Sequence, residues 1–116
     1  MVKFQLSKAK TDRLLKRDIE IIVHAIKQKY KPEKVILFGS AARGEFEEGS
    51  DIDLFIIKQT NLPRHRRPLE IYRFLKNKAL PIDFIIYTPK EFKNRLSLGD
   101  FFIKRIIKEG RILYEK

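Results

Sequence analysis

Apolar residues recur at helical spacing in the first third of the chain. Within residues 11–30 the apolar side chains form one stripe, whereas charged side chains and His24 occupy the opposite side. This pattern predicts an amphipathic helix that Pro32 brings to an end. We expect His24 to face solvent and assign it no chemistry. The stripe comprises Leu15, Ile19, Ile22, Val23 and Ile26.

Short apolar runs further along the chain predict β-strands. Residues 35–38 are wholly apolar and indicate a buried strand. Residues 51–57 and 81–87 each have a body of β-branched and other apolar residues, which predicts two more strands. We expect residues 112–114 to add a last strand at an edge of the sheet.

Helices and loops are expected between these strands. A helical turn is predicted at 39–43, helices at 69–78, 90–96 and 98–109, and loops at 44–50 and 61–68. The helical side chains expected to point inward are Ile71, Tyr72, Leu75, Phe102, Ile103, Ile106 and Ile107.

The helix boundaries carry their own signals. Thr88 and Pro89 suit the N-cap and the first position of a helix, and Gly110 suits a C-cap. The order of elements then predicts an α/β (α+β) fold with a small sheet.

Length and composition favour one domain, residues 1–116, in a cytoplasmic protein. The chain has 116 residues, no cysteine and two histidines, so disulfides, thiolate metal sites and a histidine zinc site are not expected. No apolar run approaches the ~20 residues of a membrane span, and the polar N-terminal segment does not resemble a secretory signal.

The net charge of +11 is unevenly distributed, because residues 35–62 hold two basic and five acidic side chains. A basic surface attracts polyanions, so nucleic acid is one candidate partner, and a lysine-rich solubilising surface is the alternative. Arg64, His65, Arg66 and Arg67 lie in a predicted loop. This loop either docks a polyanion or a protein partner, or is simply solvated.

The first chemical candidate is Gly39-Ser40, directly after a predicted buried strand. Glycine lets a backbone approach a ligand closely, and free amides at the start of a helical turn favour phosphate. Ordinary turn and cap chemistry explains the same pair equally well when it is considered alone.

The second candidate is the pair Asp51 and Asp53. Side chains two residues apart on a strand point to the same face, so the two carboxylates are expected side by side, about 6–7 Å apart at Cα. Such a pair is unfavourable without a cation between them, and Mg²⁺ is matched to carboxylate oxygen. The alternative is that Asp51 only caps the strand and Asp53 is a surface residue.

The third candidate is Asp83, which interrupts an otherwise apolar strand. A buried carboxylate there requires a partner or a metal, whereas an edge strand would let it face water. If its strand lies beside the 51–57 strand, the three carboxylates meet at one end of the sheet. Three carboxylates of this kind suit two-metal phosphoryl transfer.

The spacing of these motifs resembles the DNA polymerase β-type nucleotidyltransferase superfamily. Gly39-Ser-Ala-Ala-Arg-Gly44, Ser50-Asp-Ile-Asp-Leu54 and Pro81-Ile-Asp83 are similar to the minimal nucleotidyltransferases within it. The resemblance covers about residues 35–87 and implies a small mixed β-sheet flanked by helices.

The resemblance also implies roles for these residues. Asp51, Asp53 and Asp83 would be the catalytic carboxylates and would hold two Mg²⁺ ions, with Mn²⁺ as an alternative. Gly39 and Ser40 would bind the phosphates of ATP or another nucleoside triphosphate. Arg43 would either reach a phosphate or form a salt bridge with Glu45, Glu47 or Glu48.

Small members of this group resemble antitoxins whose partner is a helical HEPN-type toxin. The resemblance therefore implies transfer of AMP from ATP to a hydroxyl on a partner protein, because this chain ends soon after the expected catalytic sheet. The alternatives are a non-catalytic antitoxin that acts by binding, and a transferase that acts on RNA or a small molecule. The oligomeric state stays open.

Overall fold

A computed structural model describes residues 8–45, 51–75 and 81–116 of the chain. Its elements follow one another as α1 (Lys8–Lys29), β1 (Lys34–Phe38), β2 (Ile52–Ile57), the 3-10 helix η1 (Arg64–Arg66), α2 (Arg67–Tyr72), β3 (Ile82–Tyr87), α3 (Pro89–Ser97), α4 (Phe101–Glu109) and β4 (Arg111–Glu115). In the described ranges, no helix combines the length and the apolar character needed to cross a bilayer.

The four strands form one mixed sheet in the order β3-β2-β1-β4. β1 pairs antiparallel with both β2 and β4, whereas β2 and β3 are parallel. This arrangement confirms the predicted small mixed sheet and the last edge strand. Because β2 and β3 run in the same direction and β1 runs against them, the end of β1 and the starts of β2 and β3 lie at one end of the sheet.

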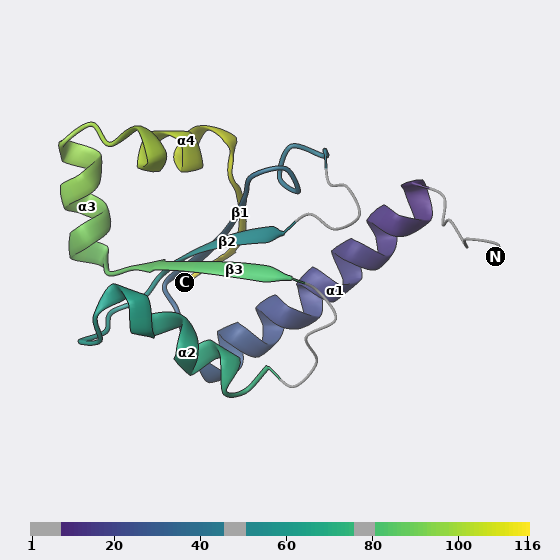
Figure 1. The fold of residues 1–116 in the computed structure, drawn as a ribbon, viewed down its shortest axis with the longest axis horizontal. Coiled ribbons are helices and arrows are strands. Elements are labelled where there is room, and N and C mark those ends of the chain that lie inside the picture. The colour runs from purple at the N-terminus through teal and green to yellow at the C-terminus, as the bar shows by residue number, and fades with distance from the viewer. Residues whose placement is uncertain (1–7, 46–50, 76–80) are drawn as a thin grey trace.

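Helices cover both faces of this sheet (Figure 1). On one face, α1 and α2 pack over a core that includes Ile26, Leu54, Ile71 and Ile86. On the other face, α3 and α4 pack over a second core that includes Phe55 and Ile103. The sheet is therefore the middle of three layers, and its buried strands explain the nearly continuous apolar runs of the sequence.

The long N-terminal helix confirms the periodicity of the sequence. α1 buries Ile19, Ile22, Val23 and Ile26, and His24 is exposed as expected. The next residues, 30–33, connect the helix to β1, with Pro32 fully buried at this turn.

Two predicted helical faces are partly wrong. Tyr72 was expected to point inward but is 37% exposed, at the end of an α2 that starts earlier and stops earlier than predicted. The last residues of the predicted 69–78 helix lie outside the described residues. Ile107 was expected to be buried but is exposed, and α4 directs Ile103 and Ile106 to the sheet instead. α4 also begins later than predicted, at Phe101 after the N-cap Asp100.

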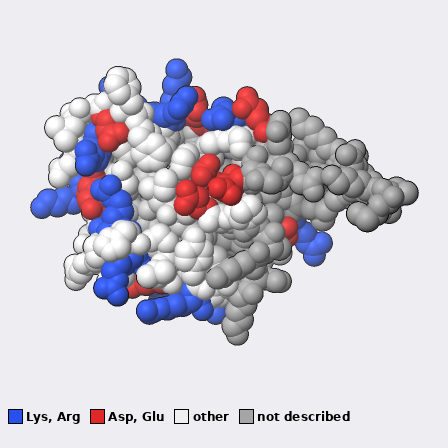
Figure 2. All heavy atoms as spheres, viewed as in Figure 1, with Lys and Arg blue, Asp and Glu red and all other residues white. Residues whose placement is uncertain are grey.

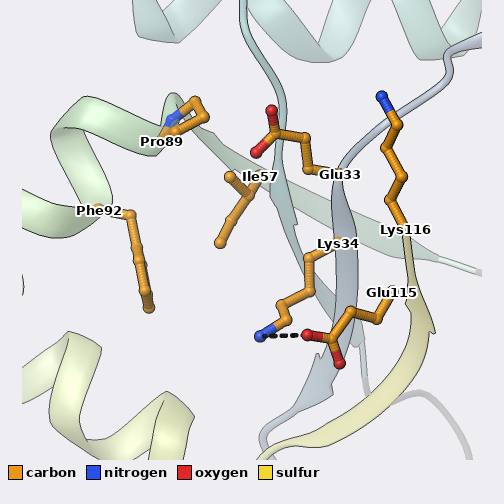
Figure 3. A pocket seen from close by; sticks show the side chains of 7 residues that line it. All are labelled: Glu33, Lys34, Ile57, Pro89, Phe92, Glu115 and Lys116. Atoms are coloured by element: carbon orange, nitrogen blue, oxygen red, sulfur yellow. Dashed lines mark ion pairs between the residues drawn. The ribbon is translucent and has the colours of Figure 1, made fainter.

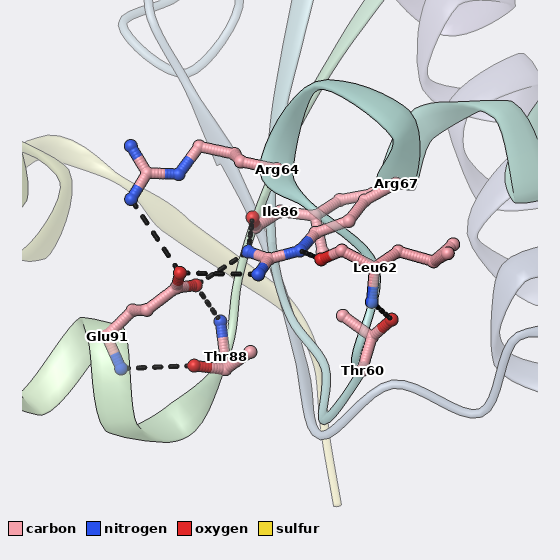
Figure 4. Close-up of polar contacts among 7 residues, drawn as sticks. All are labelled: Thr60, Leu62, Arg64, Arg67, Ile86, Thr88 and Glu91. Carbon is pink, nitrogen blue, oxygen red and sulfur yellow. Dashed lines mark hydrogen bonds and ion pairs between the residues drawn. The ribbon is translucent and has the colours of Figure 1, made fainter.

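The cap of α3 confirms the predicted helix start and links three elements. Thr88 and Glu91 form a reciprocal capping box, and Pro89 occupies the first turn. Glu91 also binds the guanidinium of Arg67 from α2 at 2.6 Å and 3.2 Å (Figure 4).

The predicted solvated loop at Arg64–Arg67 is partly wrong: Arg64, His65 and Arg66 are exposed as expected, but Arg67 is buried. Residues 64–66 form η1, and Arg67 is 5% exposed, at the start of α2. Arg67 donates to the carbonyl oxygens of Leu62 and Ile86 as well as to Glu91. A guanidinium with all these partners is satisfied inside the protein, so Arg67 holds the fold together and is not available to a polyanion.

Candidate active site

The candidate carboxylates meet where β1 ends and where β2 and β3 begin. Asp53 is the register partner of Asp83 on β3 and of Phe38 on β1. Asp51 directly precedes β2, one residue outside the strand that the sequence predicted to include it. The structure therefore brings together the three acidic residues that the sequence singled out.

The alternation of side chains places this acidic group on the face covered by α3 and α4. Asp53 shares its face of β2 with Phe55, which lies fully buried in the core beneath these helices. Asp83 is exposed and Asp53 is partly buried. Figure 2 shows a compact acidic group on this side of the molecule, over the starts of β2 and β3.

The carboxylates repel one another in the arrangement seen. Burial first, and then the charges of Asp83 and Asp51, raise the pKa of the Asp53 carboxyl above its usual value. A divalent cation placed among them would relieve this repulsion. The electrostatics of Asp53 are thus those of a group that gains from a nearby positive charge.

These carboxylates suit a metal ion that they share with other ligands, and they do not form a closed cage around it. Carboxylate oxygens are the ligands that Mg²⁺ prefers, but no group of three or more His, Cys, Asp or Glu side chains within the described residues is arranged to hold one ion. Mg²⁺ commonly takes one or two carboxylates and completes its shell with water and phosphate oxygens. The donor set here matches that pattern.

Gly39 lies directly against the Asp53 carboxylate. Its φ angle is +76°, in the left-handed region, and a Cβ atom built at Gly39 would lie 2.5 Å from Asp53 Oδ2. Any other residue would be strained here and would displace the carboxylate. Gly39 was expected from the sequence because of its backbone freedom, and its contact with the acidic group also requires a glycine here.

The segment after Gly39 consists of turns at residues 40–44 and contains no α-helix. The prediction of a helical turn at 39–43 is therefore corrected only in its extent. The amide of Arg43 donates to the carbonyl of Gly39 at 3.3 Å, and the amide of Glu45 donates to that of Ser40 at 2.9 Å. Ser40 is partly exposed at the start of this segment, beside the acidic group.

The sequence left two roles open for Arg43, a phosphate contact or a salt bridge, and the structure shows the salt bridge. Its Nε lies 3.0 Å from Glu45, and its Nη1 lies 3.6 Å from Glu109 on α4. The other two predicted partners, Glu47 and Glu48, lie outside the described residues. Arg43 therefore links the turn to α4, beside Gly39.

A small pocket next to Gly39 was missed by sequence reasoning. Its volume is about 160 Å³, and Phe38, Arg43, Phe102, Arg105 and Glu109 are among the residues that line it. Helical spacing groups residues 102, 105, 106 and 109 on one face of α4, but periodicity does not tell at which end of the sheet that face lies.

A second pocket lies at the opposite end of the sheet and is separate from the acidic group. It has a volume of about 380 Å³ and is lined by residues that include Lys34 at the start of β1 and Ile57 at the end of β2 (Figure 3). Lys34 pairs there with Glu115 at 3.5 Å. It is larger than the pocket beside Gly39, but its place in the sheet separates it from the carboxylates.

Some known proteins are similar to this chain in sequence, and others share its fold. Two proteins of Methanocaldococcus jannaschii, both named "putative protein adenylyltransferase", are 31% and 35% identical to it; the alignments cover 83% and 75% of this chain and 94% and 81% of theirs. A crystal structure described as a "putative nucleotidyltransferase" from Sulfolobus solfataricus has the same fold, with a TM-score of 0.66 and 20% identity over 100% of this chain and 94% of that one.

A second structure, described as a toxin-antitoxin with AMP-PNP, also shares the fold. Its TM-score is 0.61 at 16% identity, over 84% of this chain and 73% of that one. Residues 19–114 match the nucleotidyltransferase domain family, and this range includes the acidic group and all of the sheet except Glu115, the last residue of β4. The chain belongs to the nucleotidyltransferase domain family and is an enzyme of that class.

Proposed function

We propose that this protein is a metal-dependent adenylyltransferase that transfers AMP from ATP to a hydroxyl group of a partner protein. The observation that carries the proposal is the position of Asp53. Asp53 is the register partner of Asp83 on the neighbouring strand. Its carboxylate is close enough to Asp51 to be affected by that charge, and it lies against Gly39. The carboxylates that would hold cations thus lie next to the backbone turn that would bind phosphates. The chain that carries them belongs to a family that transfers nucleotides.

In this proposal Asp51 and Asp53 hold the cations that accompany the triphosphate. Mg²⁺, when bound, neutralises phosphate charge and makes the α-phosphorus easier to attack. The backbone at Gly39 and the hydroxyl of Ser40 bind the terminal phosphates, and Arg43 adds a positive charge at the edge of the site. Arg43 keeps its ion pairs with Glu45 and Glu109 in this arrangement.

The chemical step is an in-line displacement. The acceptor hydroxyl oxygen forms a bond to the α-phosphorus while the bond from that phosphorus to the oxygen bridging to the β-phosphorus breaks. Pyrophosphate leaves with the electron pair of the broken bond. Asp83, exposed at the start of β3, accepts the hydroxyl proton and passes it to solvent.

A protein acceptor is supported by the relatives and not by the site itself. The Methanocaldococcus jannaschii relatives are named as protein adenylyltransferases, and one protein of the same fold was solved as a toxin-antitoxin with AMP-PNP. We propose that this chain is likewise the antitoxin of such a pair, and that a helical HEPN-type toxin supplies the hydroxyl.

The test is transfer of label from ATP carrying a labelled α-phosphate. The protein is incubated with Mg²⁺ and with the product of an adjacent reading frame that encodes a small helical protein. Parallel reactions contain RNA or small hydroxyl acceptors instead. We expect label on the partner protein, and we expect Asp53→Asn and Asp83→Asn to abolish it.

Asp18→Asn is the matched control, because Asp18 lies on α1, which packs on the face of the sheet opposite to Asp53. This variant should label the partner as the wild type does. Label on RNA or on a small molecule alone would reassign the acceptor. If Asp53→Asn still bound the partner and protected cells while no label was transferred by the wild type, the protein would be a binding antitoxin and the transfer proposal would be wrong.

A further inference from the structure

The pocket beside Gly39 adjoins the proposed phosphate site but is not explained by it. Gly39 and Arg43 belong to both, whereas the remaining walls come from the end of β1 and from α4. We propose that this pocket receives the nucleobase of the nucleotide and selects adenine by its 6-amino group. The inference rests on the proposed function and adds the residues that recognise the base.

The size of the pocket suits one ring system. Sites that enclose a whole drug-sized ligand have volumes of about 300–1,000 Å³, and this pocket has about 160 Å³. A base fits within it while the sugar and the phosphates stay outside, over the carboxylates. Because Asp53 and Phe38 are register partners, the pocket and the acidic group are also direct neighbours on the sheet.

The pocket walls are apolar and aromatic. The rings of Phe38 and Phe102 meet edge to face, with centroids 5.7 Å apart and an interplanar angle of 86°. Ile106, which is buried beneath α4, adds an aliphatic surface. Phe102 also contacts the fully buried ring of Phe55, so it is a fixed wall and does not swing freely. A base that lies against such rings gains stacking energy, whichever of the bases it is.

Glu109 gives the pocket its selectivity. Its carboxylate lies 3.6 Å from Arg43 and 3.7 Å from Arg105, distances typical of ion pairs without short hydrogen bonds. A carboxylate has about four acceptor positions, so Glu109 retains capacity to accept from an amino group. With the 6-position of the base facing Glu109, adenine presents its amino donor and guanine presents a carbonyl oxygen, which a carboxylate would repel. The amino group of guanine is at the 2-position and does not face Glu109 in this orientation. The site should therefore prefer ATP to GTP.

The test compares ATP, GTP and inorganic tripolyphosphate as ligands, each with Mg²⁺, by calorimetry. Tripolyphosphate reports on the phosphate site without a base. We expect Phe102→Leu to weaken ATP binding about tenfold and to leave tripolyphosphate binding unchanged. Phe101→Leu is the matched control, because Phe101 is the preceding residue, is 87% exposed and does not line the pocket. Glu109→Gln should reduce the preference for ATP over GTP.

A second measurement uses only the wild-type protein, in case Phe102→Leu fails to fold. Backbone amide resonances of Phe102, Arg105 and Ile106 should shift when ATP is added and stay in place when tripolyphosphate is added. Equal shifts with both ligands, or none with ATP, would place the base elsewhere and overturn the pocket assignment alone. If the wild type bound neither ATP nor tripolyphosphate, the proposed function would fail and the pocket assignment with it.

Discussion

Asp53 combines a place in the proposed site with an energetic cost. Burial and two neighbouring carboxylates raise its pKa, so the ionised form is disfavoured in the folded protein relative to the unfolded chain. The contribution of this group to stability is therefore largest at low pH and is lost as pH rises through the raised pKa. Strain of this kind at a reactive group is a common compromise between stability and activity.

We predict that Asp53→Asn stabilises the protein at neutral pH in the absence of divalent cations. Asparagine removes the charge that Asp83 and Asp51 repel, so the midpoint of thermal unfolding should rise. The gain should shrink as pH falls and vanish below the ordinary pKa of aspartate, where the wild-type carboxyl is protonated in both states. Thermal unfolding followed by circular dichroism at several pH values measures this. A lower midpoint for the variant at neutral pH would show that Asp53 is held by favourable contacts instead.

Gly39 is predicted to tolerate no side chain. Gly39→Ala would place a Cβ atom 2.5 Å from Asp53 Oδ2 on a backbone with φ of +76°. We expect a loss of about 1–3 kcal/mol in the free energy of unfolding and a weaker response to Mg²⁺, measured by urea titration with and without the ion. Gly44→Ala is the control: its φ is +74°, but nothing lies within 4 Å of the added atom. Equal effects of the two variants would leave only backbone strain, without displacement of Asp53.

Tyr30 presents a different cost, a buried hydroxyl. Its oxygen lacks a hydrogen-bond partner among the described residues, and burial, with a smaller effect of Glu70, raises its pKa to about 12. Tyr30→Phe removes the unsatisfied group and keeps the ring over which Lys58 lies. We expect the free energy of unfolding to stay equal or to rise by about 1 kcal/mol, measured by urea denaturation. A clear loss of stability would reveal a hydrogen bond to that hydroxyl in solution.

Among the elements, α2, β3 and α3 are joined through one guanidinium. Arg67 at the start of α2 binds the carbonyl of Ile86 on β3 and the carboxylate of Glu91 on α3, while Arg64 lies over the Tyr87 ring. The same Glu91 caps α3. Because β3 carries Asp83, this network fixes the strand that supplies the third carboxylate, without touching the site.

The Arg67–Glu91 network predicts acid sensitivity of the fold. Hydrogen bonds from Arg67, together with the Thr88 amide and nearby positive charge, lower the pKa of Glu91 to about 2 from an ordinary 4.5. A lowered folded-state pKa means that the stabilisation is present above about pH 4.5 and is lost as pH falls toward 2.

Glu91→Gln should cost about 1–3 kcal/mol at neutral pH, because a buried Arg67 loses its charged partner. The difference from the wild type should shrink between pH 4.5 and pH 2, as measured by urea unfolding across this range. Glu115→Gln, in the more exposed pair with Lys34, is the control and should change little. A difference independent of pH would mean that packing, and not ionisation, accounts for the loss.

For the molecule as a whole, an acidic group lies on a chain of net charge +11. The surrounding positive field attracts a polyphosphate, and the carboxylates attract the cation that travels with it. Both attractions act over distances at which salt screens them.

Added KCl should therefore weaken ATP binding several-fold at a constant Mg²⁺ concentration. Calorimetry at increasing KCl measures this dependence, with a non-ionic osmolyte as control for osmotic effects. An affinity that did not change with KCl would show that the nucleotide is held by close contacts alone.

The order of elements and the identity of the candidate residues could be inferred from the sequence, because both depend on local patterns. Helical periodicity identified α1, apolar runs identified the strands, and Thr88-Pro89 identified the start of α3. The spacing from Gly39 to Asp53 indicated the family, which the comparisons then established.

The relations between distant segments depended on the tertiary structure. Parallel pairing of β2 and β3 placed Asp83 beside Asp53, the packing of α2 buried Arg67, and α4 brought Glu109 to Arg43. Each contact joins residues far apart in the chain, and its free energy arises only when the layers close and water is excluded. Local sequence patterns therefore determine which side chains each helix or strand carries, whereas tertiary packing determines which of those side chains come into contact.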